Sequence, residues 1–112
     1  MTGKVWTISF YEDHRGKSPV LEFINVLPAE DRAKIDDTLK LLEEFGASLR
    51  MPHAKHIKGH LWKLRPGGNR LFYFIYRNEQ FIILHGFKKK TQRISKGDIE
   101  IATNRMREFE EK

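Results

Sequence analysis

Apolar and polar residues alternate along four stretches of the chain, and this period of two is typical of strands with one buried face. The four predicted strands cover residues 4–11, 60–65, 70–77 and 80–85. Short turn sequences, Pro66–Asn69 and Asn78–Glu79, separate the last three of them. These three strands are therefore predicted to form an antiparallel meander.

Apolar residues at intervals of three and four predict three helices. They extend from Ser18 to Leu27, from Pro28 to Phe45 and from Ser95 to Phe109. Ser18 is a good N-cap, and Pro19 suits the first helical position because its missing N–H costs nothing there. Gly46 is expected to end the second helix, and Ser95 with Asp98 resembles a capping pair. The order β-α-α-β-β-β-α predicts one α+β domain over residues 1–112, with helices on one side of a mostly antiparallel sheet.

The net charge becomes informative when it is divided along the chain. The whole sequence carries +6. Residues 53–96 hold eleven Lys and Arg against one acidic residue, Glu79, a balance of +10, whereas each flanking segment is −2. Concentrated positive charge attracts polyanions, and nucleic acid is the commonest of these in a cell. The alternative is a solvated basic surface without a ligand.

Composition excludes several classes of protein. The chain has no cysteine, which rules out disulfide frameworks, thiolate metal sites and cysteine nucleophiles. Its apolar runs are far shorter than the roughly 20 residues that span a bilayer. Its first residues lack the apolar core of a signal peptide. We therefore expect a soluble cytoplasmic protein that does not contact membranes.

Basic side chains are expected to gather at one end of the meander. Lys63 and Arg65 share a strand face because they are two residues apart, and Arg70 begins the next strand after a turn. Lys88–Lys90 and Arg93 follow the last strand, whose end lies beside the start of its antiparallel neighbour. The sequence thus predicts a positive site in which Arg65 and Arg70 bind phosphate with both arms of the guanidinium. For the lysine run alone, a solvated segment is the simpler interpretation.

Three segments of this region resemble the core segments of RelE/HigB-type toxins, most closely the phage-derived branch of that superfamily. They are Leu61–Arg65 (LWKLR), Gly67–Phe74 (GGNRLFYF) and Leu84–Gln92 (LHGFKKKTQ). Their order and spacing carry the resemblance. It extends over nearly the whole chain through the helix that begins at Ser18, the Leu27-Pro28 pair, Gly46 and the last helix.

The resemblance implies a small α+β fold with a twisted antiparallel sheet and the role of toxin in a type II toxin–antitoxin system. Such toxins cleave mRNA, usually in the ribosomal A site, by attack of an RNA 2′-hydroxyl on the adjacent phosphate, without a metal or other cofactor. The implied partners are mRNA, the ribosome and a cognate antitoxin of the helix-turn-helix, HigA-like kind. Operator DNA is implied only through that antitoxin.

This cleavage needs positive charge at the phosphorane oxygens and proton transfer at O2′ and O5′. Arg65 and Arg70 suit the first role because a guanidinium stays protonated, and we expect Arg70 at the surface. Lys89 and Lys90 match the family's basic pair, and like charges lower the pKa of a crowded lysine. His85 titrates near neutral pH, although a packing role in the sheet is an equal alternative. The residues expected to bind RNA are Lys63, Lys88, Arg93 and Lys58.

Two features depart from the family pattern and leave the proton-transfer roles open. Lys63 stands where the family usually has Glu, which reverses a charge within the site. The segment Thr91–Ser95 contains no aromatic residue, whereas some relatives use one there to stack on a base. Four aromatic residues of the meander offer other stacking surfaces, but about half of them are expected in the core: Trp62, Tyr73, Phe74 and Tyr76.

His53, His56 and His60 have the spacing of metal ligands on a helix. Gly59 and nearby lysines favour a loop instead, and no carboxylate lies beside these histidines. We therefore expect no metal site.

The leading hypothesis is an mRNA endoribonuclease toxin. The rival is a non-catalytic RNA- or ribosome-binding module, or an inactive toxin that serves as antitoxin partner and co-repressor, because each needs the same basic surface. A DNA-binding regulator is disfavoured, since the last helix is acidic and no short basic recognition helix is present. Two modes of antitoxin binding stay open. The antitoxin either places acidic residues in the basic site or contacts the helices and blocks entry to the ribosome.

Overall fold

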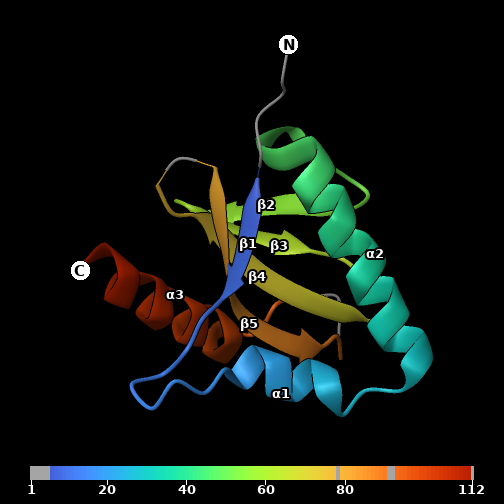
Figure 1. Cartoon of the computed structure of the whole chain (residues 1–112), viewed down its shortest axis with the longest axis horizontal. Coiled ribbons are helices and arrows are strands. Elements are labelled where there is room, and N and C mark those ends of the chain that lie inside the picture. Colours follow the sequence, from blue (N-terminus) through green and yellow to red (C-terminus); the bar gives the residue numbers. More distant parts are fainter. Residues whose placement is uncertain (1–5, 78, 91–92, 112) are drawn as a thin grey trace.

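The first strand of the chain pairs with the last one, so the beginning of the chain forms one edge of the sheet. The computed structural model describes residues 6–77, 79–90 and 93–111; the predicted turn residue Asn78 and residues 91–92 lie outside them. Within these ranges five strands form one sheet in the order β1-β5-β4-β3-β2. They are β1 (Thr7–Phe10), β2 (Ala54–Lys58), β3 (Leu61–Leu64), β4 (Asn69–Ile75) and β5 (Gln80–Lys88). All neighbours are antiparallel except β1 and β5, which run parallel (Figure 1).

The helices begin and end where local sequence favours it. They are α1 (Pro19–Asn25), α2 (Ala29–Phe45) and α3 (Lys96–Glu110), and a short 3-10 turn (Gly46–Ser48) follows α2. The Ser18 hydroxyl accepts a hydrogen bond from the Leu21 amide, and the Ser95 hydroxyl accepts one from the Asp98 amide at 3.0 Å. Both predicted N-caps are therefore confirmed.

Two apolar clusters cover the two faces of the sheet. Leu71 and Tyr73 of β4 pack with residues of α1 and α2, whereas Phe72 and Phe74 pack with residues of α3. A strand that is apolar on both faces needs cover on both. The predicted α+β class and mostly antiparallel sheet are confirmed, but the helices lie on both faces, and the expectation of one side is wrong.

Strand β2 is absent from the sequence prediction, which placed a loop around His56. Three of its five side chains, those of Lys55, His56 and Lys58, are exposed, and its pairing with β3 shifts register after His56. An edge strand with so few buried residues lacks the alternation by which strands are identified. His56 lies opposite Trp62 in the ladder, so the three histidines are not aligned on a helix.

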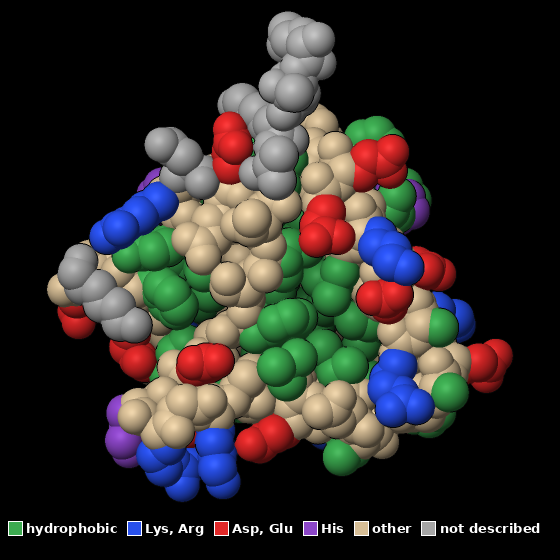
Figure 2. All heavy atoms as spheres, viewed as in Figure 1, with side chains coloured by type: hydrophobic (Ala, Val, Ile, Leu, Met, Phe, Trp, Pro, Cys, Tyr) green, Lys and Arg blue, Asp and Glu red, His purple; other side chains and the backbone are tan. Residues whose placement is uncertain are grey.

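Hydrophobic side chains are visible at the surface between α1, α2 and β1 (Figure 2). A shallow groove of about 290 Å³ lies between these elements. Its lining residues are Phe10, Leu21, Ile24, Arg32, Ile35, Asp36 and Leu39. Of the helices that the structure describes, none has the length and apolar character needed to cross a membrane.

Candidate active site

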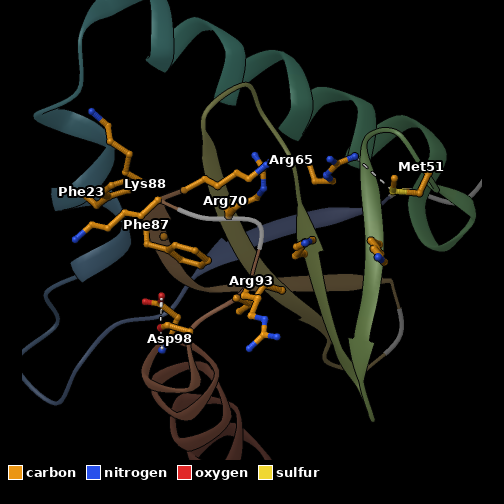
Figure 3. A pocket seen from close by; sticks show the side chains of 15 residues that line it. Phe23, Met51, Arg65, Arg70, Phe87, Lys88, Arg93 and Asp98 are labelled. Atoms are coloured by element: carbon orange, nitrogen blue, oxygen red, sulfur yellow. Dashed lines mark hydrogen bonds between the residues drawn. The ribbon is translucent and has the colours of Figure 1, made fainter.

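A pocket of about 790 Å³ opens beside the turn between β3 and β4 (Figure 3). Eight of its lining residues are basic, and Asp98 is the one acidic residue that lines it in the described part of the chain. The basic residues are Lys55, Lys63, Arg65, Arg70, Lys88, Lys89, Lys90 and Arg93. Seven of these eight are among the predicted site residues. The structure therefore brings together the basic residues that the sequence placed at one end of the meander.

Strand register explains this convergence. Lys63 lies opposite Lys55 on one side and opposite Phe72 on the other, so all three side chains share the sheet face on which α3 packs. Arg70 lies opposite Phe87. The Lys89 amide donates a 2.8 Å hydrogen bond to the Gly68 carbonyl, which ties the lysine run to the turn between β3 and β4.

Arg70 is held more firmly than the sequence suggests. Its exposed fraction is 5%, and its Nη1 donates hydrogen bonds to the carbonyls of Gly67 at 2.8 Å and Asn69 at 2.7 Å. The expectation of a surface-facing Arg70 is wrong, because the turn folds back onto the guanidinium. Burial and the nearby Arg65 lower the pKa of Arg70, but an arginine remains protonated at neutral pH.

Arg65 is partly exposed and reaches toward the loop before β2. Its Nη1 donates to the Pro52 carbonyl at 3.3 Å and lies 3.6 Å from the Met51 sulfur. The two guanidinium groups therefore approach the pocket from different strands, Arg65 directly after β3 and Arg70 in β4. Both arginines line the pocket, and guanidinium groups are well suited to bind phosphate.

Lys63 has the pKa shift that bears most directly on proton transfer. Burial lowers its pKa, and the positive charges of Arg70, Lys55, Arg65 and Lys89 lower it further. A lowered pKa increases the share of neutral amine at a given pH. Lys63 is therefore an amine of lowered pKa that lines the basic pocket.

His85 and Lys58 do not line the pocket. Lys58 is exposed near the end of β2. His85 is only 13% exposed, and its Nε2 forms a 2.7 Å hydrogen bond with Asp98 Oδ1. The Ser95 hydroxyl donates to the other Asp98 carboxylate oxygen at 2.7 Å. Burial lowers the pKa of His85, and its hydrogen bond to the Asp98 carboxylate opposes this shift.

Aromatic residues that the sequence did not single out also line the pocket. Phe87 belongs to the β5 strand, and Phe23 reaches the rim from α1. A Cβ atom on Gly86 would come within 2.8 Å of the Phe23 ring and 2.9 Å of Leu71, so the glycine permits this approach. The sequence signal for Phe87 is its place in the His85–Phe87 segment, directly before the lysine run. Strand periodicity alone does not tell whether this ring is buried or lines a pocket.

The four aromatic residues of the predicted meander divide between core and surface as expected. Tyr73 and Phe74 are buried, whereas Trp62 and Tyr76 are partly exposed. Lys55 is the basic pocket residue that sequence reasoning missed. Its signal is its place opposite Lys63, which becomes visible only when β2 is known to be a strand.

Comparison with known proteins gives a family and a fold. The profile of the family described as phage derived protein Gp49-like (DUF891) matches residues 22–107. No curated protein sequence matches the chain. Among solved structures, RelE in the archaeal RelE–RelB complex from Pyrococcus horikoshii has a TM-score of 0.61 at 16% identity, over 80% of this chain and 100% of that chain.

Two bacterial structures give the same result. The toxin–antitoxin complex RelBE2 from Mycobacterium tuberculosis has a TM-score of 0.57 at 16% identity, over 77% of this chain and 100% of that chain. A mutant of the E. coli toxin RelE in the free state has a TM-score of 0.55 at 22% identity, over 92% of this chain and 99% of that chain. At these identities the likeness shows a shared fold.

Proposed function

The chain belongs to the phage-derived Gp49-like family, and from this premise we propose that it is the toxin of a type II toxin–antitoxin pair. Two of the solved structures that share its fold are toxin–antitoxin complexes, which supports a protein antitoxin as partner. We propose a helix-turn-helix, HigA-like antitoxin, through which alone the toxin would reach operator DNA. Its targets would be mRNA and the ribosome in the cytoplasm.

We propose further that the protein is a ribosome-dependent mRNA endoribonuclease. The observation that carries this proposal is the convergence of eight basic side chains in one pocket. In the reaction, the RNA 2′-oxygen bonds to the adjacent phosphorus and the bond from phosphorus to O5′ breaks. The products are a 2′,3′-cyclic phosphate and a 5′-hydroxyl, so one proton leaves O2′ and one is delivered to O5′. No metal or other cofactor takes part.

Each part of the pocket suits one requirement of this reaction. Arg65 and Arg70 would stabilise the charge on the phosphorane oxygens. Lys63, whose pKa is lowered, is the amine best suited to take the proton from O2′. Lys89 and Lys90, both exposed at the pocket, would supply the proton to O5′. Lys88 and Arg93 would bind the flanking phosphates.

His85 and Lys58 receive lesser roles in this proposal. The contact of His85 with Asp98 and its absence from the pocket lining favour a supporting role over direct proton transfer. Lys58 lies outside the lining and would contribute at most to long-range attraction of RNA.

The test is an in vitro cleavage assay that maps transcript 5′ ends by primer extension. The same mRNA is offered free and on programmed ribosomes, with wild-type protein and with a Lys89→Ala/Lys90→Ala variant. We expect cuts only on ribosomes and none with the variant. Lys58→Ala is the matched control, because it removes a lysine that does not line the pocket, and it should cut normally.

The other outcomes separate the alternatives. Cuts on free RNA would retain the enzyme but remove the ribosome from the reaction. Binding to ribosomes without any cut would overturn catalysis and leave a non-catalytic ribosome-binding module or an inactive toxin.

A further inference from the structure

Phe87 is an aromatic residue inside a pocket otherwise lined mainly by positive charge. It lies opposite Arg70 in the β4–β5 ladder and stays partly exposed. In the close view its ring lies between the basic side chains and Asp98 (Figure 3). In the proposed function the lysines and arginines would bind phosphate groups, and a hydrocarbon ring adds nothing to that contact. Phe87 packs against the apolar cluster under α3, and its exposed part offers the pocket a surface for a second kind of ligand group.

The ring is fixed from two sides. The His85 imidazole stacks on it with a centroid distance of 5.4 Å and an interplanar angle of 25°. Phe72 meets it edge-on at 5.1 Å. His85 itself is fixed by the 2.7 Å hydrogen bond to Asp98, whose carboxylate is also bound by the Ser95 hydroxyl. One face of the Phe87 ring is thus covered by a fixed imidazole, while the ring remains partly exposed and lines the pocket.

Nucleobases are the planar groups that accompany phosphates in a nucleic acid. Stacking of a base on an aromatic side chain is tolerant of sequence, because every base has a π-face. Strand alternation places His85, Phe87 and Lys89 successively along one face of β5 and its extension. A base stacked on the part of Phe87 that lines the pocket would therefore have its phosphate near Lys89 and Arg70, both of which line the same pocket.

We propose that Phe87 is the base-binding residue of this pocket, and that His85 and Asp98 position it. The proposal rests on the proposed function, because it names the substrate contact of the same site. It assigns to β5 the stacking surface that the segment Thr91–Ser95 does not supply. His85 is then a positioning residue that acts through the Phe87 ring.

The test measures binding and does not require cleavage. The probe is a fluorescein-labelled hexamer of 2′-O-methyl adenosine, which lacks the attacking hydroxyl, and its partner is an abasic hexamer with the same backbone and charge. Fluorescence anisotropy at low salt gives both affinities. We expect the wild-type protein to bind the adenosine hexamer about tenfold more tightly than the abasic one, the effect of stacking one base.

Phe87→Leu should remove this preference and leave the affinity for the abasic hexamer unchanged, whereas Phe87→Trp should keep it. Lys89→Ala should weaken the binding of both hexamers by the same factor. Phe23→Leu is the matched control: it shortens the other aromatic residue that lines the pocket, one that packs with the opposite apolar cluster, and it should keep the preference. Thermal denaturation of each variant verifies that it is folded.

The proposal is overturned if wild-type protein binds both hexamers equally, or if folded Phe87→Leu keeps the preference. If Phe87→Leu weakened the binding of both hexamers by the same factor, the proposal would also be overturned, because the ring would then only shape the pocket. The proposed function fails separately: a protein that shows the base preference but cuts no RNA on or off the ribosome would retain the subsite and lose the catalysis.

Discussion

Lys63 connects the charge of the pocket to the pH dependence of the proposed reaction. Its pKa is lowered by burial and by neighbouring cations, one of which is Lys55 on the adjacent strand. If neutral Lys63 takes the proton from O2′, kcat/KM rises with pH until this amine is deprotonated. Lys55→Ala removes one positive charge, so the pKa of Lys63 rises toward its ordinary value. The rising limb of the pH profile should therefore move to higher pH.

The measurement is the rate of transcript cleavage across pH for the wild-type protein and Lys55→Ala. Lys58→Ala removes another exposed lysine of the same strand and should leave the profile in place. Lys63→Arg should be inactive at every pH, since the guanidinium stays protonated and cannot accept the proton from O2′. A profile that Lys55→Ala does not move would assign proton transfer to another group.

Arg70 combines a proposed catalytic role with a structural one. Its guanidinium holds the carbonyls of Gly67 and Asn69 from a position that is 5% exposed. Arg70→Ala leaves these carbonyls without their donor and opens space beneath the turn, which should cost about 1–3 kcal/mol of unfolding free energy. Urea denaturation measures the loss. Lys89→Ala, an exposed change in the same pocket, should stay within about 0.5 kcal/mol of wild type, and an unaffected Arg70→Ala would mean that the two hydrogen bonds contribute nothing.

The same residue shows the limit of a prediction from sequence. Its position at a strand start, beside a glycine-rich turn, was enough to place it with Arg65 and the lysine run. Its burial depends on how the turn folds over the side chain, which no residue pattern encodes.

A hydrogen bond between His85 and Asp98 connects β5 to the start of α3. Burial holds the pKa of His85 below its ordinary value of 6.5, and nearby Arg105 lowers it as well, while Asp98 acts in the opposite direction. The unfolded chain therefore takes up the proton first as pH falls. The stability that neutral His85 contributes is fully present above about pH 6.5 and is lost as pH falls through the window below this value.

Comparison of the unfolding free energies at pH 7.5 and pH 5 tests this. Wild-type protein should lose more stability between these two pH values than His85→Gln, which has no proton to take up. Asp98→Asn removes the group that raises the pKa of His85. This variant should therefore lose more stability than wild type between pH 7.5 and pH 5. An equal pH loss in wild type and His85→Gln would show that His85 does not titrate differently in the folded and unfolded states.

The end of α2 gives a prediction about packing. Gly46 has φ of +57°, and a Cβ atom there would collide with the Trp6 indole, which in turn stacks on Phe81. Gly46→Ala should destabilise the fold by about 2 kcal/mol or more, because both the left-handed backbone and the clash oppose alanine. Thermal unfolding measures this. Gly16→Ala is the matched control for backbone strain, because its φ is +82° but a Cβ there meets no atom within 4 Å, and its loss should be smaller.

Helix ends and the meander could be predicted from sequence because their signals are local: Ser18 and Ser95 cap the helices that follow them, and Gly46 ends one. The pairing of β1 with β5 joins residues more than 70 positions apart, and β2 is recognisable only by its partner β3. The sheet order, and with it Lys55, therefore depends on long-range contacts that hydrophobic periodicity does not report.

Basic side chains gather in the pocket, and many of the acidic ones lie on α2. The pocket collects eight basic side chains, whereas α2 carries several acids and its Lys40 forms an ion pair with Asp36 at 3.1 Å. Binding of single-stranded RNA by the pocket should release counterions, so the logarithm of the affinity falls linearly with the logarithm of salt concentration. The slope counts the phosphates that the protein neutralises.

A slope measurement therefore separates pocket lysines from lysines that only add to net charge. Lys89→Ala should reduce the slope by about 0.7, the value for one phosphate of a single strand. Lys40→Ala changes the net charge of the protein by the same amount but acts on an exposed helix face where an acid already pairs with the lysine, so the slope should be unchanged. Anisotropy titrations of the 2′-O-methyl hexamer from low to moderate salt give both values. Equal slopes for the two variants would mean that RNA responds to the overall charge and that the pocket does not hold its phosphates.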